Sequence, residues 1–320
     1  MTQATTTTPA SAPRRIDWRD YVVYIGFVVI FVAFAIGLGQ YGFLSGNNLL
    51  NIVRQTATIS VMAVAMTFVI SSAEIDLSVG AVAGLGAVAT ALTISSFGVA
   101  SGIFAGLLTG LIVGSINGLL VTRAGIPSFL VTLGTLGITT GVAMWITGTA
   151  PVPILDDTYN AVFGSGNLFG AIPSLLIWTL VALGVGHVIL RKTPFGRQVL
   201  ATGGNEVAAR FSGVDTKRVK FLVLVASSTV AALAGMLYAG RLNSGRFQWG
   251  QGDELSVIAA VILGGTRLSG GIGTVFGAVL GSVMIGLINN GLILMGLEYS
   301  QQLIIRGAII ILAVALARRK

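Results

Sequence analysis

The sequence contains no cysteine and a single histidine, His187. The absence of cysteine excludes disulfide bonds, thiolate nucleophiles, cysteine zinc sites and iron–sulfur clusters. A histidine metal site would need carboxylate ligands beside His187, and the sequence places no suitable cluster there. The phosphate-binding pattern GxxxxGK[ST] is also missing, which excludes ATP binding in the usual P-loop manner. We therefore expect no metal, no cofactor and no catalytic residue.

Charged residues are scarce as well. They make up 9% of the chain, whereas about 25% is usual for a soluble domain. Hydrophobic residues make up 54%, and the mean hydropathy is +0.90. We predict an all-α polytopic membrane protein, with a disordered cytosolic tail at residues 1–20 and a single transmembrane domain at residues 21–320. The net charge of +8 does not indicate nucleic-acid binding, because the basic residues lie between hydrophobic segments, where lipid headgroups are the simpler partner.

Long apolar segments follow one another along the chain. A helix needs about 20 residues to cross the hydrocarbon core, and this length predicts about ten spans, including short or broken ones. The predicted spans are residues 21–39, 51–71, 77–95, 100–122, 128–147, 172–190, 219–240, 255–264, 273–294 and 301–317. An even number places both termini on one side of the membrane. Because cytosolic loops hold most Lys and Arg, and these gather in the tail, at the end and in residues 191–220, we expect cytosolic N- and C-termini.

Glycine recurs at a fixed spacing in several spans. One span has glycine at every fourth position, at residues 102, 106, 110, 114 and 118, and Gly137 with Gly141 repeats the spacing. Small residues four apart form a groove along a helix, which lets a neighbouring backbone approach closely. We expect tight helix packing at these positions.

Two polar segments interrupt the apolar pattern, at residues 71–80 (SSAEIDLSVG) and 263–274 (LGGTRLSGGIGT). They are either broken-helix elements beside a solute path or tight cytosolic turns. In the first, Glu74 and Asp76 would diverge by about 200° on a helix, so a joint acid–base role is unsupported. Asp76 or Ser78 could instead cap the following helix, and capping is the favoured role of Asp76.

Further polar residues lie inside the later spans. Asn289, Asn290 and Arg306 need partners, which structural hydrogen bonds between helices supply more often than ligands do. With Glu74, Asp76 and Ser78, the two asparagines are the candidates for a translocation path.

The stretch of residues 191–220 is the longest internal connection. Asn205 can cap a short helix that continues to Phe211, Glu206 suits its first turn, and Gly213 follows its end. This surface helix is either a docking element or an amphipathic connector that lies on headgroups. On the external side, Asp253 and Glu254 are either helix N-terminal anions or partners of Arg241 and Arg246.

Three motifs carry a resemblance to a known family: EIDLSVG, GGNEVAARFSGVDTKRVKF, and GDELSVIAAVILGGTRLSGGIGTVFGAVLGSVMIGLINNGLILMG. With them the chain resembles the ribose, galactose, arabinose and xylose permeases of bacterial ABC importers from roughly the first span to the end. The resemblance implies an inner-membrane permease that forms a homodimer and works with cytosolic ATPase subunits and an external solute-binding protein. Glu74 departs from the family pattern, which often has a small residue there.

The resemblance also implies roles for two groups of residues. The coupling segment that would enter the ATPase subunit comprises Gly203, Asn205, Glu206, Ala208, Ala209 and Gly213. The surface that would meet the binding protein comprises Arg241, Arg246, Asp253 and Glu254. Three alternatives stay open: an ion-coupled secondary transporter that uses Glu74 or Asp76, an ABC permease for a nucleoside, polyol or branched-chain amino acid, and a passive structural anchor.

Overall fold

The computed structural model describes residues 22–317, and the expected tail at residues 1–20 lies outside them. The structure is mostly helical with little sheet, as predicted. Its first half contains α1 (Val22–Gly37), the short η2 (Gly39–Tyr41), α2 (Gly46–Ser71), α3 (Val79–Phe97), α4 (Val99–Thr122), α5 (Ser128–Thr147), β1 (Val152–Pro153), α6 (Asp157–Asn160), η3 (Ala161–Ser165), β2 (Asn167–Leu168) and β3 (Ile172–Pro173). The second half contains α7 (Ser174–Lys192), α8 (Pro194–Gly204), α9 (Glu206–Phe211), α10 (Thr216–Leu242), β4 (Ser244–Gly245), α11 (Asp253–Leu263), α12 (Val275–Leu294) and α13 (Tyr299–Ala317).

Seven of the described helices are long and apolar enough to cross a membrane: α2, α3, α4, α5, α7, α10 and α12. The other predicted spans coincide with α1, α11 and α13, of which α11 has only 11 residues. At about 1.5 Å per residue it reaches roughly half-way through a hydrocarbon core. The number of crossings stays a prediction.

The helices differ in how deeply they are buried. The apolar window of α2 is 83% buried, whereas that of α7 is 22% buried. Helix α2 therefore lies in the middle of the bundle, and α4, α5 and α7 expose apolar side chains on its outside, where a membrane would supply lipid.

The glycines of α4 pack as the spacing predicts. A Cβ at Gly110 would lie 2.5 Å from the carbonyl oxygen of Ser228, and one at Gly114 would lie 2.7 Å from the Cα of Val225. Both neighbours belong to α10, so these glycines allow close contact between the two helices. Tight packing was also expected at Gly137 and Gly141 of α5, but within the described chain these glycines face open space, so that expectation is wrong.

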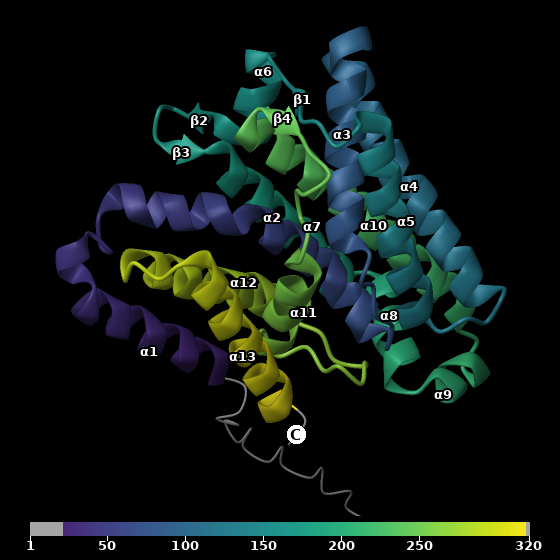
Figure 1. The fold of residues 1–320 in the computed structure, drawn as a ribbon. Coiled ribbons are helices and arrows are strands. Elements are labelled where there is room, and N and C mark those ends of the chain that lie inside the picture. The colour runs from purple at the N-terminus through teal and green to yellow at the C-terminus, as the bar shows by residue number, and fades with distance from the viewer. Residues whose placement is uncertain (1–21, 318–320) are drawn as a thin grey trace, which may run out of the picture.

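Both polar interruptions are breaks between helices. Residues 72–78 separate α2 from α3, and residues 264–274 separate α11 from α12. The connection at residues 191–220 holds one helix more than expected, because Thr193 accepts a hydrogen bond from the Gly196 N–H and Pro194 occupies the first position of α8. In Figure 1, α8 and α9 lie at the lower right, and the short strands and α6 lie toward the opposite, upper end.

Candidate functional site

The predicted helix at Asn205–Phe211 is present as α9. The Asn205 side chain accepts a hydrogen bond from the Ala208 N–H at 3.0 Å, which satisfies one of the free donors at the helix start. At the other end, Gly213 adopts φ +86° and donates to the carbonyl of Arg210. Only glycine takes this left-handed conformation at no steric cost, so Gly213 ends the helix sharply.

Gly203 places α8 directly against both helix breaks. A Cβ there would overlap the carbonyl oxygen of Ser71 and lie 2.8 Å from the Gly271 nitrogen. The Gly271 N–H itself donates to the Ser71 carbonyl at 3.0 Å. The end of α8, the break after α2 and the break after α11 therefore meet at one point, although they are far apart in the sequence.

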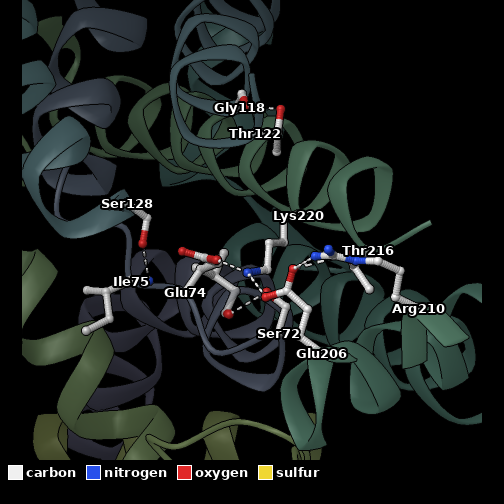
Figure 2. A network of polar contacts seen from close by, with 11 residues as sticks. Ser72, Glu74, Ile75, Gly118, Thr122, Ser128, Glu206, Arg210, Thr216 and Lys220 are labelled. Atoms are coloured by element: carbon white, nitrogen blue, oxygen red, sulfur yellow. Dashed lines mark hydrogen bonds and ion pairs between the residues drawn. The ribbon is translucent and has the colours of Figure 1, made fainter. Parts of the chain in front are cut away.

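A chain of charged side chains links α9 to the first of these breaks (Figure 2). Lys220 Nζ lies 2.7 Å from Glu206 Oε2 on α9 and 2.8 Å from Glu74 Oε1 in the break. Arg210 and the Thr216 hydroxyl also donate to Glu206 Oε1, at 2.9 and 3.2 Å. Glu74 thus contacts the start of α10 and belongs to this network rather than standing alone in a path.

The charges of the network become more buried toward Glu74. The exposed fraction of the side chain is 63% for Arg210, 35% for Glu206 and 10% for Glu74. The hydrogen bond from Lys220 holds the pKa of Glu206 below its ordinary value, against the opposing effect of burial. Exposed pairs such as Arg210–Glu206 contribute little to stability, whereas the inner contact of Lys220 with Glu74 is screened less by solvent.

Asp76 is fully buried and accepts three hydrogen bonds. Its Oδ1 accepts from the N–H and the hydroxyl of Ser78, and its Oδ2 accepts from the Ser227 hydroxyl at 2.8 Å. Asp76 therefore stabilises the turn that leads into α3. Of the two candidate caps, Ser78 makes no capping hydrogen bond with its side chain and instead contacts Asp76 and Asn117.

Lys220 and Ser227 lie seven residues apart on α10, which is about two turns and brings them to one face. Glu74 and Asp76 contact this face, so the break between α2 and α3 runs along α10. The break is also held by α5, because the hydroxyls of Ser128 and Thr132 accept hydrogen bonds from its backbone.

The two asparagines of the predicted path are distant from this network. Asn290 exchanges two hydrogen bonds with Asn48, at 3.0 and 2.8 Å, and so joins α12 to the beginning of α2. Glu74 follows the other end of α2, about 35 Å away along a helix of this length. The structure supports interhelical bonding for Asn290 and does not bring the path candidates together.

Asn289 lines a small pocket with Ser256 and Arg306, between α11, α12 and α13. The Ser256 hydroxyl and Arg306 Nε are buried and have no hydrogen-bond partner among the described residues. These two groups were not singled out together by the sequence, since they lie on different helices.

The candidate docking residues near the other end of the molecule have separate partners. Tyr238 donates to Asp253 Oδ2 at 2.5 Å, and Glu254 packs against Gly80. Arg241 donates to the Arg54 carbonyl. Within residues 22–317, neither acid forms an ion pair with Arg241 or Arg246, so the alternative that they pair is wrong. Both acids occupy the first turn of α11. Arg246 instead stacks over Trp249, at 5.5 Å from the ring centroid.

Two exposed apolar side chains on α9 were not predicted as functional residues from the sequence. Val207 is 62% exposed and Phe211 is 90% exposed. They lie four residues apart, so they share one face of the short helix. That spacing was the available signal, but α9 is too short for an apolar periodicity to stand out.

The long apolar helices and the apolar surface around them define a multi-pass membrane protein. Among residues 22–317, no group of three or more His, Asp or Glu side chains is placed to hold a metal ion. The family profile described as "Branched-chain amino acid transport system / permease component" matches residues 48–314. The chain belongs to this family of transport permeases.

Individual relatives cover most of the chain. It is 42% identical to the ribose import permease protein RbsC of Bacillus subtilis (strain 168) over 280 residues. The aligned region covers 87% of each chain. It is 36% identical over 304 residues to the L-arabinose transport system permease protein AraH of Escherichia coli (strain K12), which covers 95% of this chain and 92% of the relative. These relatives confirm the resemblance to sugar ABC permeases. Comparison with solved structures finds no match.

Proposed function

We propose that the chain is the non-catalytic permease subunit of a binding-protein-dependent ABC importer that moves a sugar across the bacterial inner membrane. The observation that carries the proposal is the small helix α9, presented beside a charged network that reaches a helix break, in a chain related to ribose and arabinose permeases. Two such chains would form the translocation unit, ATPase subunits would contact α9, and a solute-binding protein would contact the opposite end.

The proposed permease crosses the membrane ten times and has both termini in the cytosol. The beginning of α1 and the end of α13 lie toward the bottom of Figure 1, away from the short strands at the top. Arg191 and Lys192 end α7 and Arg197 lies in α8, next to α9 in the chain, as the positive-inside rule expects of a cytosolic surface.

The apolar face of α9 suits a groove of an ATPase subunit. Val207 and Phe211 project from a helix whose other face is held to the bundle by Glu206. Burial of an aromatic side chain in a partner pocket is a common source of interface affinity. Val207 and Phe211 thus add to the coupling residues expected from the resemblance, which are Gly203, Asn205, Glu206, Ala208, Ala209 and Gly213. Of these, Gly203 and Gly213 shape the backbone.

Replacement of Phe211 with serine is expected to weaken ATPase binding by about tenfold or more, because a buried aromatic anchor contributes about 2 kcal/mol. Binding of the purified ATPase subunit to permease in nanodiscs measures the change. Phe169→Ser is the matched control, because Phe169 is 91% exposed and lies between β2 and β3 at the other end. Equal affinities for the two variants would contradict docking through α9.

Transport itself tests the function. Proteoliposomes that hold the permease, its ATPase subunit and its binding protein are expected to take up ribose or arabinose only when ATP is supplied. Uptake driven by a proton or sodium gradient without the ATPase would favour the ion-coupled alternative. Uptake of a branched-chain amino acid instead of a sugar would keep the ABC class and change the cargo, which the description of the family profile makes the specific rival.

A further inference from the structure

Lys220 stands between two carboxylates that come from different parts of the chain. Glu206 belongs to α9, and Glu74 belongs to the break between α2 and α3 (Figure 2). We propose that Lys220 is the link through which movement of α9 reaches this break, so that the Glu206–Lys220–Glu74 contacts couple the ATPase subunit to the membrane helices. The inference rests on the proposed function and adds to it the residues that carry the coupling.

The contacts of α9 favour this route. Within residues 22–317, the side-chain hydrogen bonds from α9 to α10 all end on Glu206, at Thr216 and Lys220. Lys220 then forms the only ion pair of this part of the chain that reaches the break. Beside the backbone contact that α8 makes with the break at Gly203, the side-chain contacts of α9 therefore reach the break through one ammonium group.

The break can respond as a unit because it is held at several points. Asp76 is bonded to Ser227 of α10, and the N–H groups of Ile75 and Leu77 donate to hydroxyls of α5. A shift of Lys220 would thus change the position of the break between α5 and α10, rather than bend a free loop. Elements of this kind, with a small number of fixed contacts, can adopt alternative arrangements as rigid bodies.

Charge also makes the link sensitive to the partner. Two carboxylates share one ammonium, and among the described residues only Glu206 has a second cation, Arg210, beside it. If an ATPase surface draws Glu206 away, Lys220 keeps Glu74 as its remaining partner, because an unpaired charge at 10% exposure would be costly. Docking would therefore break the contact of Lys220 with Glu206 and keep its contact with Glu74.

The test is the number of ATP molecules hydrolysed per sugar imported, measured in proteoliposomes with the full complex. We expect Glu74→Gln and Lys220→Met each to raise this number about fivefold, the lower end of coupling between linked sites, while ATPase binding stays as in wild type. The double variant is expected to be no worse than either single variant, because both remove the same link. Lys217→Met is the control, since it removes an exposed lysine of the same helix that has no ion pair in the described chain.

Unchanged ATP use in the Glu74→Gln variant, or strictly additive effects in the double variant, would overturn the link. If Lys220→Met fails to assemble, Lys220→Arg is informative: retained coupling supports the link, and loss of coupling with normal assembly contradicts it. Failure of the proposed function looks different, because the wild-type complex itself would then show no ATP-dependent uptake.

Discussion

Replacement of Gly203 with alanine is expected to lower the stability of the protein by about 3 kcal/mol and to abolish transport. A Cβ at this position would overlap the Ser71 carbonyl oxygen and approach the Gly271 nitrogen to 2.8 Å. Both are backbone atoms, so no side chain can rotate away, and overpacking of this kind costs about 1–3 kcal/mol or more. Thermal unfolding in detergent and sugar uptake measure the two effects.

Gly204 provides the matched control at the next position. A Cβ there would meet only the Gly271 Cα, at 3.7 Å, which is ordinary contact. Gly204→Ala is therefore expected to unfold at the same temperature as the wild type, or slightly higher because alanine favours the helix. Similar unfolding temperatures for the two alanine variants would contradict the close approach of α8 to the helix breaks.

Asp76→Ala is expected to reduce the free energy of unfolding by about 3 kcal/mol, because it leaves three buried donors without an acceptor. Those donors are the N–H and hydroxyl of Ser78 and the hydroxyl of Ser227. The loss also releases the turn into α3 from α10, so transport should fall with stability. Denaturant titration of the detergent-solubilised chain gives the free energy.

Asp215→Ala is the control for this variant. Asp215 also accepts a backbone N–H at the start of a helix, from Arg218 at 2.9 Å, but its side chain is exposed. Loss of an exposed cap costs about 1 kcal/mol. The interpretation of Asp76 as a buried bonding centre would fail if the two alanine variants were equally stable.

The apolar runs predicted the helices well because a lipid environment requires long stretches without charge. Residues 128–147 were predicted with the bounds that α5 has. Helix α8 was missed, since it is too polar and short to form an apolar run, although Thr193 and Pro194 form a recognisable start. The glycine spacing predicted the contacts of α4 correctly, but it predicted the same for Gly137 and Gly141 of α5, which meet no neighbour in the described chain.

The candidate site was predictable only where its geometry is local. Asn205 and Gly213 could be assigned to the ends of α9, because caps act within a few residues. The contact of Glu74 with Lys220 joins distant segments, and no local pattern indicates it. The suggested pairing of Arg246 with an acid failed because an aromatic ring, Trp249, lies closer along the chain.

The pairing of β1 with β4 has a practical consequence for labelling the protein. Val152 pairs with Gly245 and Pro153 with Ser244, so two loops from opposite halves of the sequence form one small platform. A reporter peptide inserted into either loop would disturb both. In the described chain β2 pairs only with β3, the next strand along the chain. The tip between them is therefore the better insertion point for a tag that shows which side of the membrane this end occupies.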